Sequence, residues 1–201
     1  MSGTTFILHR LAFQASIWQQ IFDSQGWAST ILPGNTKLLP QLINLESNNK
    51  PWPDLLIVDD SIRDPNIEEL CSWLESRNAQ LPVIAVTASN TGKISPTAQQ
   101  LAKSQGAFDL LPDFEESVLA IAAVNAMKSA AAALGNPSTD NNALVTCIVN
   151  ISKDFATQSN DIKAKPESDN NKEPLSEDIP SNQKVEATPK KKKRLYRGRE
   201  Y

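Results

Sequence analysis

Apolar residues in the first 135 positions form short continuous runs separated by longer stretches with helical spacing. The runs are rich in aliphatic and β-branched residues and carry too few polar positions to alternate. This pattern is typical of strands at the centre of a parallel sheet that helices cover on both faces. The predicted strands are residues 6–8, 27–32, 55–58, 83–87 and 108–111.

Between these runs, apolar residues recur every three or four positions and predict five helices. Asp64-Pro65 and Ser95-Pro96 predict the starts of the third and fourth, with a capping side chain followed by proline in the first turn. Strands that alternate with helices in this way predict a three-layer, doubly wound α/β domain with a five-stranded parallel sheet. The predicted inward positions of the last three helices are Ile67, Leu70, Cys71 and Leu74; Ala98, Leu101 and Ala102; Val118, Ile121, Ala122 and Met127.

The composition changes near Gly135. Residues 1–135 contain all four tryptophans, 8 Lys+Arg and 13 Asp+Glu, and they suffice for one hydrophobic core. Residues 136–201 are rich in Asn, Ser, Pro and Lys, which is typical of disordered chain, so we expect a linker over 136–189 and a basic tail over 190–201. Within the linker, the apolar run ALVTCIVNI at 143–151 indicates a sixth strand, a docking motif or an aggregation-prone segment. We favour docking.

The two cysteines, Cys71 and Cys147, provide neither a disulfide framework nor a pair at metal-ligand spacing. The N-terminal residues lack the long apolar core of a signal peptide, and the mostly alanine run 117–134 contains Asn125 and Lys128. These features predict a cytoplasmic protein without a membrane span.

The third predicted strand, PDLLIVDD, ends in two adjacent carboxylates, Asp59 and Asp60. In open parallel sheets, binding and catalytic residues lie beyond the carboxyl ends of the strands. The pair therefore either marks a functional site or caps the turn after a buried strand.

The strings PDLLIVDD, LPVIAVTAS and AKSQGAFDLLPDF resemble the third strand, the fourth strand and the passage into the fifth strand of response regulator receiver domains. The resemblance covers roughly residues 4–134 and implies a flavodoxin-like fold. It also implies that Asp59 is the position that accepts a phosphoryl group from a histidine kinase. Thr87 matches the hydroxyl that follows this group.

The chain departs from that family where the chemistry needs cations. The resemblance implies two acids after the first strand that hold Mg²⁺, but these positions are His9 and Arg10, and no acid precedes Asp23. The implied lysine after the fifth strand is also absent, and Leu110 stands at the position of an aromatic residue. We therefore expect a degenerate receiver that is not an enzyme and needs no cofactor or Mg²⁺.

The basic residues after the first strand suggest what replaces the metal. We expect Arg10, with His9, to bring positive charge close to Asp59 and Asp60. His9 is the only histidine in the chain, and a single histidine near a strand end is most often a structural residue.

The resemblance implies that the protein works by binding a protein partner through the fourth helix, fifth strand and fifth helix, about residues 95–134. One alternative is an active regulator phosphorylated on Asp59, with Asp60 as a metal ligand. A second is a regulator that binds nucleic acid or an acidic surface through its tail.

The last twelve residues, KKKKRLYRGREY, are strongly basic and contain two tyrosines. They suit contact with nucleic acid, an anionic membrane surface or an acidic protein, or else form a solvated tail. The ending YRGREY resembles the YRG-x-x-Y signature of a short uncharacterised domain known mainly from cyanobacteria, which implies a binding role. The candidate binding residues are Lys190, Lys191, Lys192, Lys193, Arg194, Tyr196, Arg197, Arg199 and Tyr201.

Overall fold

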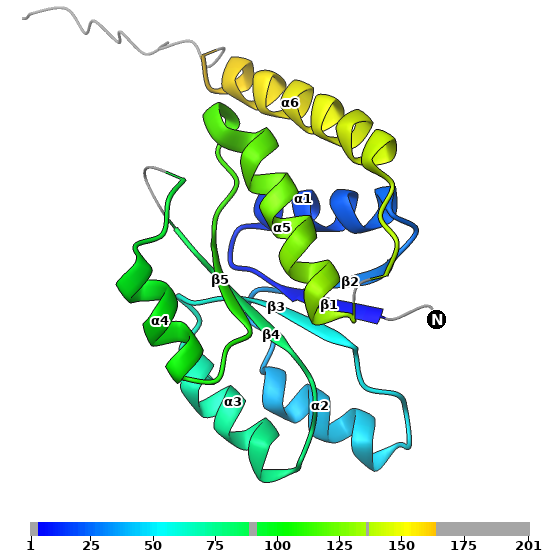
Figure 1. The fold of residues 1–201 in the computed structure, drawn as a ribbon, viewed down its shortest axis with the longest axis vertical. Coiled ribbons are helices and arrows are strands. Elements are labelled where there is room, and N and C mark those ends of the chain that lie inside the picture. The colour runs from blue at the N-terminus through cyan, green and yellow to red at the C-terminus, as the bar shows by residue number, and fades with distance from the viewer. Residues whose placement is uncertain (1–3, 89–91, 136, 164–201) are drawn as a thin grey trace, which may run out of the picture. The chain divides into compact units, whose positions relative to one another are not determined.

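A computed structural model describes residues 4–88, 92–135 and 137–163, and its centre is a five-stranded parallel sheet (Figure 1). Neighbouring strands pair in the order β2-β1-β3-β4-β5. The predicted flavodoxin-like α/β class is confirmed. The strands are β1 Thr4–Leu8, β2 Ala28–Leu32, β3 Leu55–Asp59, β4 Val83–Thr87 and β5 Asp109–Pro112.

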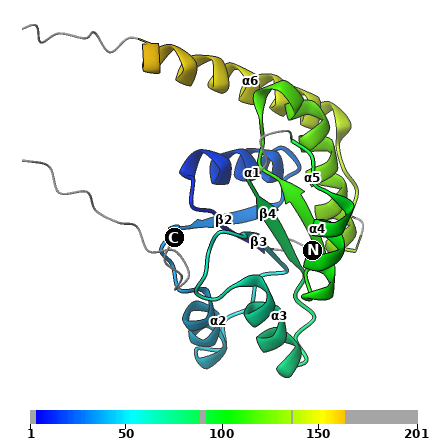
Figure 2. The same cartoon turned by 90° about the vertical axis from the view of Figure 1, so that its left-hand side faces the viewer.

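Helices cover both faces of the sheet. Helices α1, α5 and α6 lie on one face, and α2, α3 and α4 pack on the other (Figures 1 and 2). A short 3₁₀ helix, Glu116–Val118, precedes α5. The α-helices are α1 Ala12–Ser24, α2 Leu38–Ser47, α3 Ile67–Ser76, α4 Pro96–Ser104, α5 Leu119–Ala133 and α6 Asn141–Lys163.

The continuous apolar runs are explained by burial on both faces. Along β3, Leu55 and Ile57 belong to the core cluster under α1, α5 and α6, whereas Leu56 and Val58 belong to the cluster under α2, α3 and α4. Successive side chains of a strand point to opposite faces, so a central strand with two covered faces has no position for solvent-facing residues. Asp59 follows this run directly.

Asp64-Pro65 was predicted to start α3, but α3 starts at Ile67. The start of α4 agrees with the prediction. Asn66 caps α3: its side chain accepts the N–H of Glu69 at 2.9 Å, and the Glu69 carboxylate accepts the N–H of Asn66 at 3.2 Å. This reciprocal capping box satisfies two helix-end donors, whereas Asp64 alone would satisfy one. Ser95 caps α4 as predicted, accepting the N–H of Ala98 at 3.1 Å.

Two residues predicted to face inward are exposed. Leu101 on α4 and Ile121 on α5 are 59% and 67% exposed. Both predictions were wrong because the buried stripe of each helix lies about one residue away, through Ala102 on α4 and through Ala122 and Ala123 on α5. The predicted buried positions of α3 are confirmed.

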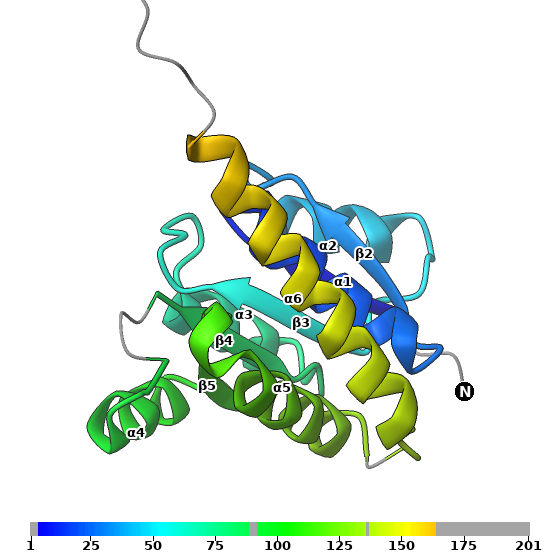
Figure 3. The same cartoon turned by 90° about the horizontal axis from the view of Figure 1, so that it is seen from above.

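The apolar segment 143–151 is part of a helix and does not form a sixth strand. Its buried residues Leu144, Cys147 and Ile151 are spaced three and four apart and join the core formed with α1 and α5 (Figure 3). Farther along α6, the ring of Phe155 meets that of Phe13 edge-on, with centroids 4.8 Å apart. Regular structure therefore continues beyond residue 135, where we expected a linker.

The start of α6 is tied to the end of α1. The Asp140 carboxylate accepts the N–H groups of Asn142 and Ala143 at 2.9 and 3.0 Å, as a capping residue does. The Gln25 side chain accepts the N–H of Asp140 and donates to its carbonyl. These bonds position α6 against α1 before its apolar stripe begins.

The predicted basic tail 190–201, and the part of the predicted linker from 164 to 189, lie outside the described residues. Within the described part of the chain, no helix combines the length and the apolar character needed to cross a bilayer.

Candidate functional site

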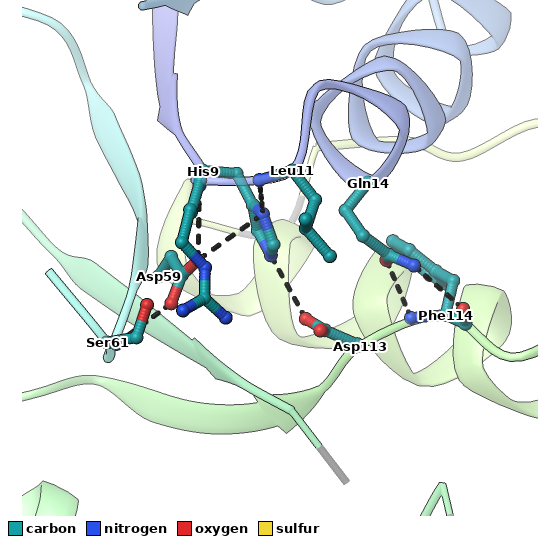
Figure 4. Close-up of polar contacts among 8 residues, drawn as sticks. His9, Leu11, Gln14, Asp59, Ser61, Asp113 and Phe114 are labelled. Atoms are coloured by element: carbon teal, nitrogen blue, oxygen red, sulfur yellow. Dashed lines mark hydrogen bonds and ion pairs between the residues drawn. The ribbon is translucent and has the colours of Figure 1, made fainter. Parts of the chain in front are cut away.

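The first acid of the predicted pair, Asp59, is the last residue of β3 and is only 4% exposed. Its Oδ2 accepts the backbone N–H of Arg10 at 3.1 Å, and its Oδ1 accepts the backbone N–H of Ser61 at 2.8 Å (Figure 4). Burial alone would raise the pKa of Asp59. The donors on Ser61 and Arg10, together with the charge interaction with His9, outweigh burial and hold the pKa of Asp59 below its ordinary value.

The imidazole of His9 lies between two carboxylates at the carboxyl end of β1 (Figure 4). Its Nδ1 is 3.4 Å from Asp59 Oδ2, and its Nε2 is 3.0 Å from Asp113 Oδ1. Nδ1 also accepts the backbone N–H of Leu11 at 3.0 Å, which requires a free lone pair on that atom. In the neutral ring the proton therefore lies on Nε2, which donates to Asp113.

Asp113 is the residue of this site that sequence reasoning missed. It follows β5 directly, and its backbone N–H donates to the carbonyl of Thr87 at 3.0 Å. Because Asp113 comes directly after β5, it lies at the same sheet edge as Asp59. This position in the sequence could have indicated that Asp113 belongs to the site.

The segment after β5 is held against α1 by a second side chain that the sequence did not single out. Gln14 is buried; its Nε2 donates to the carbonyl of Phe114 at 2.9 Å, and its Oε1 accepts the N–H of Phe114 at 2.8 Å. The ring of Phe114 packs edge-on against Trp18, with centroids 5.2 Å apart. These contacts fix the backbone next to Asp113 and so orient its carboxylate toward His9.

The other predicted site residues lie nearby but take different roles. Asp60 is half-buried and its backbone N–H donates to the carbonyl of Val86 at 2.8 Å. Thr87 is half-buried at the end of β4. The Arg10 side chain is exposed and forms no ion pair with Asp59 or Asp60 in the described part of the chain.

The expectation that the Arg10 side chain brings charge to Asp59 is therefore corrected. His9 supplies the side chain that contacts Asp59, and Arg10 contributes its backbone N–H.

The charge types at this sheet edge are opposite to those that the receiver resemblance implies. There, acids follow the first strand and a lysine follows the fifth. Here a base, His9, follows β1 and an acid, Asp113, follows β5. The two substitutions complement each other because each residue contacts the other.

The residues do not fit a Mg²⁺ ion, which prefers six oxygen ligands in octahedral geometry. Both oxygens of Asp59 accept backbone N–H groups, and the His9 ring lies on the side facing Asp113. In the described ranges there is no group of three or more His, Cys, Asp or Glu side chains that could hold a metal.

The fold is shared with solved structures of response regulators. A protein described as a response regulator from Chloroflexus aurantiacus matches over 67% of this chain and 99% of its own, with a TM-score of 0.51 and 18% identity. Response regulator RPA3017 in red light signaling of R. palustris matches over 69% and 99%, with a TM-score of 0.51 and 13% identity. The Mn²⁺-bound form of response regulator Rcp1 matches over the same shares, with a TM-score of 0.50 and 11% identity.

Neither a protein-family model nor a curated protein matches the sequence. At these identities, the structural matches establish that the chain has the receiver fold. The function has to be argued from the site itself.

Proposed function

We propose that this protein is a degenerate receiver, a cytoplasmic signalling module that acts by binding a protein partner. It is not an enzyme and does not transfer a phosphoryl group to Asp59 with Mg²⁺. The basic segment 190–201, which lies outside the described residues, provides a second contact. The fold shared with response regulators supports the signalling role.

The observation that carries this proposal is the position of His9 between Asp59 and Asp113. A carboxylate that attacks a phosphoryl group needs a cation that neutralises the negative charge of both reactants. The backbone N–H groups of Arg10 and Ser61 already stabilise the Asp59 carboxylate, and Asp113, 3.0 Å from His9 Nε2, adds a second negative charge to the site. The site is therefore suited to holding the strand ends together.

Treatment of the full chain with acetyl phosphate and Mg²⁺ is expected to leave Asp59 unmodified. The measurement is intact-protein mass spectrometry, with an active response regulator in the same buffer as positive control. If one phosphoryl group is added to the wild type but not to Asp59→Asn, the proposal is wrong. That result would support the alternative, an active regulator phosphorylated on Asp59.

The surface that we assign to the partner is a groove between α4, β5 and α5, lined by residues of 95–134 together with Gly92, Lys93 and Ile94. The groove has a volume of about 1060 Å³, and Leu110 and Leu111 of β5 are among its lining residues. At its sides, Ile121 and Phe108 are large apolar residues that remain exposed. Exposed apolar residues gathered along a groove are typical of a protein-binding surface.

Helix α6 covers part of α5, and the groove lies on a side of α5 that α6 leaves uncovered. The helix packs against α1 and α5, so α5 is buried both toward the sheet and toward α6 (Figure 3). The exposed residues of α5 are Ala120, Ile121, Val124, Asn125, Lys128 and Ala132. Four of these six line the groove, so most of the exposed surface of α5 faces the α4 side.

Charge indicates the chemistry of the partner segment. Lys103 and Lys128 lie along the groove, and the Lys103 ammonium is 3.8 Å from the Asp109 carboxylate. Asp109 is also held by the Ser129 hydroxyl, which donates to its Oδ2 at 2.8 Å. An amphipathic segment with apolar anchors and flanking acids complements this arrangement.

Replacing Ile121 with glutamate is expected to reduce capture of the partner at least about tenfold, because a charge would enter the apolar part of the contact. The assay is an affinity pull-down with full-length protein, quantified by mass spectrometry. Val145→Glu is the matched control, since Val145 is 60% exposed on α6, away from the groove. Equal retention of every partner by both variants would refute the groove assignment.

A further inference from the structure

A second cavity, of about 340 Å³, lies among the loops that follow β1, β2 and β3, separate from the α4–α5 groove. It contains no residue of β5 or α5. Strands β2, β1 and β3 are neighbours in the sheet, so their carboxyl ends bring these three loops together. The polar lining is supplied by Arg10, Asn35, Thr36, Lys37, Ser61, Arg63 and Asp64.

Positive charge is concentrated at this cavity in an otherwise acidic domain. Residues 1–135 carry 8 Lys+Arg and 13 Asp+Glu, yet three of those eight cations, Arg10, Lys37 and Arg63, line this one cavity. Asp64 is the single acid in the lining. Its carboxylate is 3.7 Å from the Lys37 ammonium, and both side chains are largely exposed, so this pair neutralises the cluster only weakly.

The backbone holds two of the cations near each other. Gly34, in the loop after β2, is pressed against the chain after β1: a Cβ at this position would lie 3.2 Å from the His9 carbonyl oxygen and 3.3 Å from the Arg10 Cα. A larger residue would push the two loops apart. The close approach places the loop that carries Lys37 beside Arg10.

The cavity borders the start of α2 at Lys37. Lys37 precedes the helix, and no side chain caps it. The N–H groups of the first helical turn have no carbonyl partner within the helix, and the helix dipole makes this end positive. Ser61 also lines the cavity.

We propose that this cavity binds a small ligand that carries a phosphate monoester group. Two guanidinium groups and an ammonium match a dianion, because arginine presents paired donors to two oxygens of one phosphate. The volume lies at the lower end of the range for small-molecule sites, about 300 to 1,000 Å³, and so suits a phosphate with a sugar-sized substituent. This inference stands independently of partner binding, and it adds a ligand-responsive input to the module.

The ligand would also act on the neighbouring carboxylate site through one residue. The Arg10 side chain lines the cavity, while its backbone N–H donates to Asp59. An anion that orders Arg10 would stabilise the loop carrying this hydrogen bond. The cavity and the His9–Asp59–Asp113 cluster therefore share a structural element.

Isothermal titration of the full chain with adenosine 5′-monophosphate, inorganic phosphate and adenosine tests the proposal. Saturable binding is expected for the monophosphate, and none for adenosine, which lacks the phosphate. Equal affinity for inorganic phosphate and the monophosphate would show that the phosphate group alone is recognised, which also supports the site. Equal binding of adenosine and the monophosphate, or no saturable binding of either phosphate, would overturn it.

Charge-neutralising variants locate the binding. The combined variant Arg10→Gln, Lys37→Gln and Arg63→Gln is expected to weaken monophosphate binding roughly tenfold or more. The matched control Lys50→Gln, Arg77→Gln and Lys153→Gln changes the net charge equally at residues outside the cavity and the α4–α5 groove, and should bind as the wild type does. Unchanged affinity in the first variant, or an equal loss in both, would assign binding to another basic segment and overturn the proposal.

Discussion

Replacing Ile151 with alanine is expected to lower the free energy of unfolding by about 3 kcal/mol, because a fully buried side chain is truncated in a packed core. Ile151 is 0% exposed and belongs to the cluster that joins α1, α5 and the sheet. The change removes apolar contact and leaves a cavity that helix packing can close only in part. Urea unfolding of the full chain, followed by circular dichroism, measures the loss.

The control for this prediction is on the same helix. Val149 is 49% exposed, so Val149→Ala should change the free energy of unfolding by about 0.5 kcal/mol or less. Comparable effects of the two substitutions would mean that α6 does not dock as described. A much larger loss for Ile151→Ala than for Val149→Ala would show that α6 unfolds together with the rest of the domain. The cooperative unit would then extend beyond the change in composition at residue 135.

His9→Asp is expected to destabilise the protein by about 3 kcal/mol at neutral pH. The substitution removes the ring that separates Asp59 from Asp113 and brings a third carboxylate to a buried position. Leaving buried charges without a partner typically costs about 3 to 5 kcal/mol. The backbone N–H of Leu11 would also lose its acceptor, Nδ1 of His9, at the start of α1. Chemical denaturation in the absence of divalent cations is the appropriate measurement.

Two further variants separate the roles of the neighbouring residues. His9→Gln keeps a neutral polar side chain and should destabilise the protein less than His9→Asp. Arg10→Ala should be close to neutral, because the exposed side chain forms no ion pair in the described chain and the backbone N–H to Asp59 is kept. If Arg10→Ala cost as much as His9→Asp, the side chain of Arg10 would be holding the site after all.

In this chain, His9 and Asp113 stand where the receiver resemblance implies acids after the first strand and a lysine after the fifth, and the buried Asp59 lies between the same strand ends. Asp59 remains buried at the end of β3 and still requires donors. Two backbone N–H groups supply them, and the imidazole connects the carboxylate to the segment after β5. A site arranged in this way links the ends of β1, β3 and β5.

The helical and strand elements were largely predictable because burial imposes a period on the sequence. The runs at β3 and β4 are apolar on both faces, and the capping signal at Ser95 is a local interaction. The exposed positions of Leu101 and Ile121 were not predictable in the same way. The apolar character of a residue on a helix does not reveal whether another element packs over it. The groove depends on how α4, β5 and α5 pack together, and this arrangement follows from the tertiary fold.

The sequence by itself determined the class of fold and the position of Asp59 at the carboxyl end of a buried strand. Local periodicity and capping depend on residues a few positions apart, so they can be read along the chain. Only the tertiary structure decided that His9 meets Asp113, 104 residues away in the chain, and that Arg10, Lys37 and Arg63 share one cavity. These groupings depend on strand order and loop packing, through which residues distant in sequence become neighbours.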